Sequence, residues 1–257
     1  SWHKELFDYA KKLGITIFST PFDETAVDFL EKLNCPMYKI ASFEMTDLPL
    51  IKKVAQTKKT MIISTGMSSL DEIDETFKVA KKNGAKEIIL LYCVSNYPAK
   101  NKDFNLKNIQ ILKNKFNCKV GLSDHSLDNT IAISSIAAGA EIVEKHIGLD
   151  GQKNGLDIKF SLKGKKIKVF KKLISETYNS MGKNFFYRNP SEEKSKIFRR
   201  SIFAVKDIKV GEKFTKKNIR RIRPGYGLEP KLFDKILGKK SKNNINAGDP
   251  LKKKHIK

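Results

Sequence analysis

The sequence predicts an α/β fold with a parallel sheet, of the kind found in a (β/α)8 TIM-type barrel. The first support is an alternation of short apolar runs with stretches of helical periodicity. The runs, read as strands, span residues 15–19, 37–42, 60–64, 87–92, 119–122 and 141–145. Polar or ionisable residues follow each run, as at the carboxyl ends of barrel strands, where active sites lie. We therefore expect an enzyme. The competing open doubly wound sheet is disfavoured because no glycine-rich phosphate loop follows the first run.

Start and stop signals delimit the helices between these runs. Gly14 is placed to end an opening helix, and Pro49 suits the first turn of the helix after the second run. Ser69 and Glu72 have the spacing of a capping box, and Gly84 closes the helix that they begin. Three further helices are expected at residues 105–117, 128–139 and 166–181.

The predicted barrel is incomplete, and a second domain follows it. A closed barrel of this type needs eight strands, whereas the chain has six runs, so we expect it to lack its first two βα units. We assign residues 1–182 to this partial barrel and residues 183–197, which are polar and turn-rich, to a linker. Residues 198–257 alternate short strand-like pieces with glycine and proline turns, which indicates a small β-rich domain.

Composition narrows the class of protein. The 257 residues are 40% hydrophobic, which suits a globular core, and no run has the roughly 20 apolar residues that span a membrane. We expect a cytoplasmic protein without a membrane partner. The three cysteines, Cys35, Cys93 and Cys118, lack CxxC spacing and are expected to be buried free thiols.

The net charge of +23 leaves a second class of function open. A strongly basic domain can act as a non-catalytic module that binds nucleic acid or another polyanion. Here the lysines are spread over almost every predicted helix, and no aromatic stacking pattern accompanies them. We expect a solvated basic surface with no specific nucleic-acid partner. Steeply salt-dependent binding to DNA would instead indicate the binding module.

Two histidines at the ends of consecutive runs suggest a metal site. His125 and His146 follow the fifth and sixth runs, and neighbouring parallel strands lie about 4.8 Å apart. Imidazoles at matching height can share a divalent transition metal and leave positions open for substrate and water. Either histidine alone could instead be a packing residue. Glu144 shares a strand face with His146, so it is expected to orient a ligand or act on a proton.

Lys39 lies within an apolar run and needs a partner, because an isolated buried ammonium group is costly. A phosphate group would serve, with hydroxyl donors from Ser64 and Ser123 at the ends of other strands. The alternative is an ion pair between Lys39 and Glu44, with the hydroxyls serving only as helix caps.

These residues lie in motifs that resemble the strand-end motifs of the sialic acid synthase family. The motifs read YKIASFE at residues 38–44, ISTGM at 63–67, GLSDHS at 121–126 and VEKH at 143–146. Residues 198–257, with DIKVGE at 207–212 and RPG at 223–225, are similar to that family's antifreeze-like SAF domain. The family begins with two further strands that carry an acidic residue, an Asn-His pair and a lysine. This agrees with the expectation of two absent βα units.

The resemblance implies condensation of phosphoenolpyruvate with a six-carbon N-acetylated amino sugar, giving a nine-carbon nonulosonic acid and phosphate. His125 and His146 would hold a divalent metal, typically manganese, which polarises the sugar aldehyde. Glu44 and Glu144 are the expected catalytic carboxylates. The positions that match phosphoenolpyruvate binding are Lys39, Ser42, Ser64, Ser123 and Thr20. The positions that match sugar binding are Ser95, Tyr97, Asp157 and Arg223.

Within the family, the stretch KIASFE at residues 39–44 is more similar to pseudaminic acid synthases than to N-acetylneuraminate synthases. The expected substrate is therefore a 2,4-diacetamido-2,4,6-trideoxy hexose and the product pseudaminic acid, with an N-acetylneuraminate or legionaminate synthase as the alternative. The family also implies a domain-swapped homodimer, in which the small domain reaches over the partner's barrel and Arg223 closes on the sugar.

Overall fold

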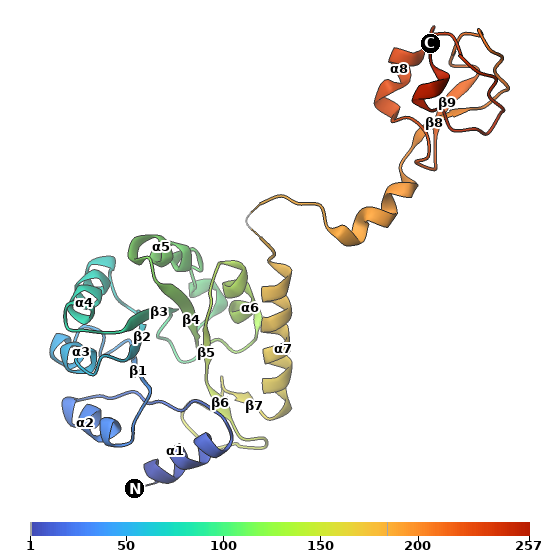
Figure 1. The fold of residues 1–257 in the computed structure, drawn as a ribbon. Helices are drawn as coiled ribbons and strands as arrows, with labels where there is room; N and C mark the ends of the chain where they lie inside the picture. The colour runs from blue at the N-terminus through green and yellow to red at the C-terminus, as the bar shows by residue number, and fades with distance from the viewer. Residues whose placement is uncertain (1, 184) are drawn as a thin grey trace. The chain divides into compact units, whose positions relative to one another are not determined.

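The chain folds into two compact units. The computed structural model describes residues 2–183 and 185–257; residues 1 and 184, which fall in the predicted barrel and linker, lie outside the described residues. The units are Ser1–Gly182, coloured blue to yellow in Figure 1, and Lys183–Lys257, coloured orange to red. Each unit has a buried apolar core of its own.

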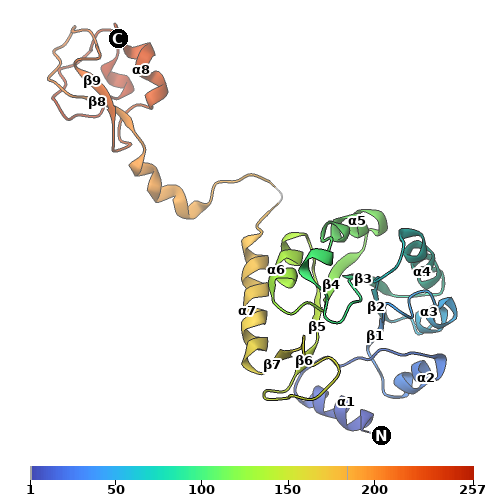
Figure 2. The same ribbon diagram turned by 180° about the vertical axis from the view of Figure 1, so that it is seen from behind.

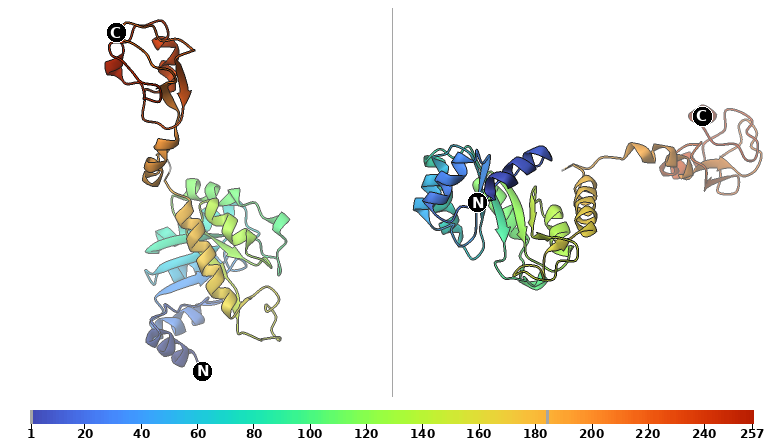
Figure 3. Two further views of the ribbon diagram at one scale, coloured as in Figure 1. Left: turned by 90° about the vertical axis from the view of Figure 1, so that its right-hand side faces the viewer. Right: turned by 90° about the horizontal axis from the view of Figure 1, so that it is seen from below.

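The first unit is built on one five-stranded parallel sheet in the order β1-β2-β3-β4-β5. The strands are β1 Met37–Ile40, β2 Thr60–Ser64, β3 Glu87–Cys93, β4 Lys119–Asp124 and β5 Val143–Lys145. The sheet is curled, and its helices lie on the outside of the curl (Figure 1 and Figure 3). These helices are α2 Glu24–Lys32, α3 Leu48–Ala55, α4 Leu70–Lys82, α5 Lys107–Phe116 and α6 Thr130–Ala137. The first unit is therefore an α/β half-barrel.

Smaller elements complete the first unit. Helix α1 (His3–Lys12) opens it, and the 3₁₀ helix η1 (Asn101–Asp103) lies between β3 and α5. After β5, the short strands β6 (Ile147–Gly148) and β7 (Leu162–Lys163) pair in parallel next to the start of α7 (Lys165–Ser180), as Figure 2 shows. None of the described helices is long and apolar enough to cross a membrane.

Local signals fix the ends of several helices as predicted. In α4, the Ser69 hydroxyl accepts the Glu72 N–H while the Glu72 carboxylate accepts the Ser69 N–H, which completes a capping box. Pro49 lies in the first turn of α3. Gly14 and Gly84 follow α1 and α4 with φ angles of +69° and +102°, which glycine adopts without strain.

The two sides of the sheet have different surroundings, because successive strand residues face opposite sides. Outward residues such as Leu90 and Leu122 are buried against the helices and belong to the main core. On the inner side, Ile62, Ile89 and Leu91 form a separate apolar cluster. Strands β2 and β3 contribute side chains to both clusters, and the main core also contains side chains of the helices.

The predicted first strand, residues 15–19, is wrong. Only Ser19 pairs with the sheet, through a single bridge to Tyr38 in which the Ser19 carbonyl accepts the Lys39 N–H at 3.1 Å. Pro21 has no N–H with which to continue a ladder, and the side chain of Ile15 is 60% exposed. The sheet therefore has five strands, and the structure shows a curled half-barrel; an eight-stranded barrel remains only an expectation.

The second unit is small and has little regular structure. Strands β8 (Ser201–Ala204) and β9 (Ile219–Ile222) pair antiparallel, and α8 (Phe233–Ile236) packs beside them. Within the predicted linker, part of the chain forms the 3₁₀ helix η2 (Pro190–Phe198) rather than turns alone. Two further 3₁₀ helices are η3 Pro230–Leu232 and η4 Lys253–His255. The core residues are Ile202, Ala204, Ile208, Phe214, Ile219, Phe233, Ile236, Ile245 and Leu251.

Candidate active site

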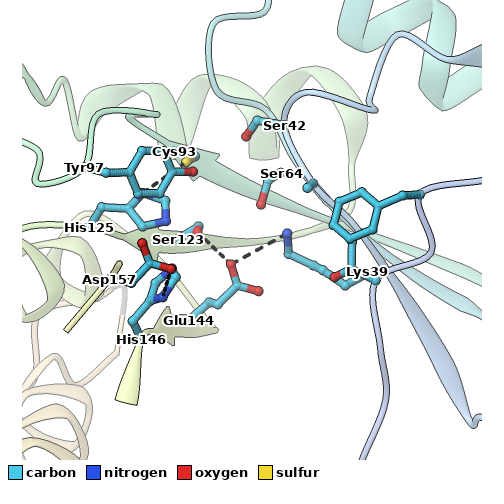
Figure 4. A pocket seen from close by; sticks show the side chains of 13 residues that line it. Lys39, Ser42, Ser64, Cys93, Tyr97, Ser123, His125, Glu144, His146 and Asp157 are labelled. Atoms are coloured by element: carbon cyan, nitrogen blue, oxygen red, sulfur yellow. Dashed lines mark hydrogen bonds and ion pairs between the residues drawn. The ribbon is translucent and has the colours of Figure 1, made fainter. Parts of the chain in front are cut away.

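A cavity of about 490 Å³ lies on the inner side of the curled sheet, at the carboxyl ends of the strands (Figure 4). Ten residues predicted from the sequence line it: Thr20, Lys39, Ser42, Ser64, Tyr97, Ser123, His125, Glu144, His146 and Asp157. The strands thus bring together at one edge side chains that are far apart in the chain. This is the edge at which barrel enzymes carry their active sites.

The two histidines lie side by side in this cavity, as predicted. Ser123 of β4 is in register with Glu144 of β5, so His125 and His146, two residues further on, emerge at the same height. Their ring centroids are 5.2 Å apart.

His125 is held by the loop after β3. Its Nδ1 lies 3.2 Å from the carbonyl oxygen of Val94 and 3.8 Å from Sγ of Cys93. The contact with the carbonyl favours the tautomer with a proton on Nδ1 and leaves the Nε2 lone pair free. Burial lowers the pKa of His125, which favours the neutral imidazole that a metal ion requires.

His146 is supported by a carboxylate and by aromatic rings. Its Nδ1 lies 3.5 Å from Oδ2 of Asp157. The buried ring of Phe160 packs edge-on against His146 at a centroid distance of 5.1 Å, and Tyr97 packs against His125 at 4.3 Å. Both imidazoles are therefore enclosed by partners that restrict their orientation.

The donor set suits a divalent transition metal with only two protein ligands. Each histidine engages its Nδ1, as metal-binding histidines do, and keeps Nε2 for coordination. Among residues 2–183 and 185–257, no group of three or more histidine, cysteine, aspartate or glutamate side chains could hold a metal ion. An ion bound by the two imidazoles would thus keep several positions for water or substrate.

The other end of the cavity holds the buried Lys39. Its Nζ lies 3.6 Å from Oε1 of Glu144 and donates to the carbonyl of Ile40 at 3.1 Å. The alternative partner Glu44 is wrong, because the ion pair is made with Glu144. Burial lowers the pKa of Lys39, and the negative charge of Glu144 only partly opposes this effect. Ser123 donates its hydroxyl to the same Glu144 oxygen at 2.6 Å.

Two buried polar atoms near Lys39 have no hydrogen-bond partner among the described residues. They are Oγ of Ser64 and Oε2 of Glu44. A buried hydroxyl without a partner costs free energy, and a bound ligand can supply the missing hydrogen bond. Ser64 lines the cavity, so its hydroxyl is available to a bound molecule.

Three predicted site residues do not line the cavity. Glu44 lies beyond the end of β1, and the Ser95 hydroxyl lies against Gly66, where an added Cβ would be 2.1 Å from it. Arg223 belongs to the second unit and follows β9. Their assigned roles remain predictions.

Four residues of the site were not predicted from the sequence. Phe22, Ala41 and Cys93 line the cavity, and Phe160 packs behind the histidines. Cys93 could have been found, because it shares the inward face of β3 with Leu91. The other three carry no polar chemistry and no pattern that distinguishes them from ordinary apolar residues.

A parallel half-barrel whose strand ends carry a lysine, hydroxyls and paired imidazoles defines a barrel-type enzyme site. Comparison with known proteins identifies the kind of enzyme. Residues 1–185 match the NeuB family and residues 199–257 match the SAF domain. The chain therefore belongs to the NeuB family, the sialic acid synthases.

Relatives with assigned activities match between three quarters and nearly all of the chain. The pseudaminic acid synthase of Helicobacter pylori is 41% identical over 251 residues, covering 97% of this chain and 74% of that protein. The N,N'-diacetyllegionaminic acid synthase of Campylobacter jejuni is 40% identical over 253 residues, covering 97% and 76%. The structure of an N-acetylneuraminic acid synthetase from Leptospira borgpetersenii in complex with citrate is 32% identical, with a TM-score of 0.71, covering 75% and 67%.

Proposed function

We propose that this chain condenses phosphoenolpyruvate with a 2,4-diacetamido-2,4,6-trideoxy hexose to give pseudaminic acid and phosphate. The observation that carries the proposal is the cavity with two chemically different ends. A buried lysine and a hydroxyl with no partner among residues 2–183 and 185–257 lie at one end, and two neighbouring imidazoles lie at the other. Membership of the NeuB family and 41% identity to a pseudaminic acid synthase support it.

Phosphoenolpyruvate would bind at the lysine end. The ammonium group of Lys39 is buried and its ion pair with Glu144 is long, at 3.6 Å, so a phosphate dianion would supply a further counter-charge. The hydroxyl of Ser64 has a free hydrogen to donate, and those of Ser42 and Ser123 lie on the same rim. Thr20 adds a further hydroxyl from the segment before α2.

The sugar would bind at the imidazole end. His125 and His146 would hold a divalent metal, expected to be manganese, which when bound supplies Lewis-acid polarisation of the sugar aldehyde. Tyr97 and Asp157 flank the two imidazoles and offer a phenol and a carboxylate to sugar hydroxyl and acetamido groups. Burial raises the pKa of Tyr97, so its phenol stays protonated and can donate.

The reaction balances without a further reactant. C3 of phosphoenolpyruvate forms a bond to the aldehyde carbon of the sugar, and water adds to C2. One proton of that water neutralises the new sugar alkoxide. When the C2–O bond to phosphate breaks, its electron pair leaves with phosphate, and the C2 hydroxyl becomes the carbonyl of the product as it gives its proton to phosphate. Glu144 lies between Ser123 and Lys39 and would take the proton from water. Glu44, with one buried unpaired oxygen, is the second proposed carboxylate.

A second candidate is the synthesis of a related nonulosonic acid. The 40% identity to a legionaminic acid synthase favours this alternative almost equally, and N-acetylneuraminate is the third member of the series. All three reactions use the same phosphoenolpyruvate chemistry and differ only in the sugar.

The domain-swapped homodimer is part of the same proposal, with Arg223 as the contribution of the second unit to sugar binding. The chain mass is 29.2 kDa. Light scattering of the purified chain should give about twice this mass, and the mass of one chain would contradict the dimer.

Phosphate release tests the proposed reaction. The chain is incubated with phosphoenolpyruvate and Mn²⁺, and either 2,4-diacetamido-2,4,6-trideoxy-L-altrose or N-acetylmannosamine. We expect release that depends on the diacetamido sugar and stops when the metal is chelated. Release with N-acetylmannosamine alone would favour the alternative. Absence of release with either sugar, together with salt-dependent DNA binding, would overturn the enzyme in favour of the basic binding module.

A further inference from the structure

A buried ion pair lies directly behind the two histidines. Asp124 precedes His125, Lys145 precedes His146, and the two charged residues are register partners across β4 and β5. Nζ of Lys145 lies 2.7 Å from Oδ2 of Asp124, and the side chains are 3% and 0% exposed. Neither residue lines the cavity, because each points to the opposite side of the sheet from its histidine.

The ion pair belongs to a hydrogen-bond network that includes the residues directly before and after His125. The other carboxylate oxygen, Oδ1 of Asp124, accepts the N–H of Ser126 at 2.8 Å. Lys145 also donates to the carbonyl of Ser126. The residues before and after His125 are therefore both tied to the strand that carries His146.

The segment around Ala99 and strand β7 also bind the backbone of the same two histidines. The carbonyl of His125 accepts the N–H of Ala99 at 3.0 Å, and the carbonyl of His146 accepts the N–H of Leu162 at 2.8 Å. These bonds fix the ends of β4 and β5 individually. The pair of Asp124 and Lys145 links the side chains of the two strands on the outer side of the sheet, and the hydrogen bond from Ser123 to Glu144 links them on the inner side one residue earlier.

We propose that Asp124 and Lys145 are positioning residues that set the spacing between the imidazoles of His125 and His146, and through it the affinity for a divalent metal. The effect on metal affinity rests on the proposed function, whereas the effect on the spacing of the imidazoles does not. A buried ion pair gives little net stability compared with an apolar pair of similar shape, so a requirement for geometry is a reason for keeping it here.

The test separates stability from geometry. Lys145→Met and Asp124→Asn each leave one buried charge without its counter-charge, whereas the double variant Asp124→Asn/Lys145→Met removes both charges. Breaking one partner of a buried pair is destabilising, and removing both is often neutral. The matched control is Leu122→Ala, which creates a cavity on the same face of β4 two residues earlier.

Two readouts on the full chain decide the outcome. The first is the nuclear Overhauser effect between the ring protons of His125 and His146 without metal, and the second is Mn²⁺ affinity by electron paramagnetic resonance. We expect all three charge variants to lose the ring contact and to bind Mn²⁺ at least about tenfold more weakly. The double variant should regain the melting temperature but not the affinity, and Leu122→Ala should keep both readouts within twofold.

The proposal fails if the double variant keeps the ring contact and binds Mn²⁺ as the unmodified chain does. It also fails if Leu122→Ala loses both readouts to the same degree, because the pair would then act only through stability. If a single variant does not fold, the double variant alone decides. If the unmodified chain shows the ring contact but binds no Mn²⁺, the metal part of the proposed function is wrong, and the ring contact still tests the spacing.

Discussion

The inner face of the sheet carries two sets of side chains, here called the apolar layer and the polar layer, that differ in chemistry although the same strands form them. Ile62, Ile89 and Leu91 make the apolar layer, a cluster with no polar group to satisfy. In the polar layer, which lines the cavity, Ser64 has a buried hydroxyl without a partner among the described residues, and Lys39 has a buried charge with a lowered pKa. Lys39 is in register with Ile62 and Ser64 with Leu91, so residues that stabilise the fold and residues available to a ligand are direct neighbours on one face, and the polar layer is the costly one to bury.

The largest effect should come from the imidazole end of the polar layer. His125→Ala should lower the rate of phosphate release by roughly 1,000-fold, because it removes one of only two imidazole donors. The melting temperature should change little, since His125 contributes to the cavity and not to the apolar core. A steady-state assay with phosphoenolpyruvate, sugar and Mn²⁺ measures the loss. Activity within tenfold of the unmodified chain would contradict the role assigned to His125 in the polar layer.

The lysine end should show a smaller loss together with unchanged or greater stability. Lys39→Met keeps the length of the side chain and removes the charge, so binding of phosphoenolpyruvate should weaken about 100-fold. The free energy of unfolding should not fall, because the buried ammonium no longer has to lose its hydration. Calorimetric titration with phosphoenolpyruvate and thermal unfolding check both expectations. A large loss of stability with unchanged affinity would show that Lys39 belongs to the structural layer.

Ser64→Ala tests at a single hydroxyl whether the polar layer serves ligand binding rather than stability. Phosphoenolpyruvate should bind about tenfold more weakly, since one hydrogen bond to the phosphate is lost. Thermal unfolding should be unchanged or slightly shifted to higher temperature, because the hydroxyl has no hydrogen-bond partner in the described part of the chain. Thr65→Val is a control on the next residue, whose hydroxyl already bonds the carbonyl of Leu91 and should affect stability but not affinity. The opposite pattern would contradict the assignment of Ser64.

The smallest expected effect is a pH dependence of phosphoenolpyruvate binding. The pKa of Lys39 is lowered from 10.5 by burial, so the ammonium group loses its proton at a lower pH than an exposed lysine does. Affinity should therefore be constant while Lys39 is charged and fall several-fold as the pH rises through this lowered pKa. A pH profile of the KM for phosphoenolpyruvate measures the fall. Lys39→Arg, which stays charged, should flatten the profile, and an unchanged profile would assign the titration to another group.

Much of the site followed from the sequence, because polar residues that end parallel strands meet at one edge. This rule brought Lys39, Ser64 and His146 together, and the two histidines lie at the predicted neighbouring positions. The capping box at Ser69 was equally local and therefore equally predictable.

The remaining features depend on contacts that no single segment encodes. The run at residues 15–19 has the composition of a strand, but pairing also needs N–H groups and a buried face, which Pro21 and the exposed Ile15 do not provide. Asp124 lies between the predicted site residues Ser123 and His125, yet the alternation of strand residues turns it away from the cavity toward its register partner Lys145. Phe160 approaches the histidines only through the fold of its loop.

The most direct test of the separation between the two layers compares Ile89→Ala with Lys39→Met in the same two assays. Ile89 lies in the apolar layer, so its truncation should lower the free energy of unfolding by about 2 to 5 kcal/mol. Its phosphate release per folded molecule should stay within about threefold, whereas Lys39→Met should lose binding of phosphoenolpyruvate without losing stability. If instead activity falls in step with stability in both variants, the two layers are not separate and the account is wrong.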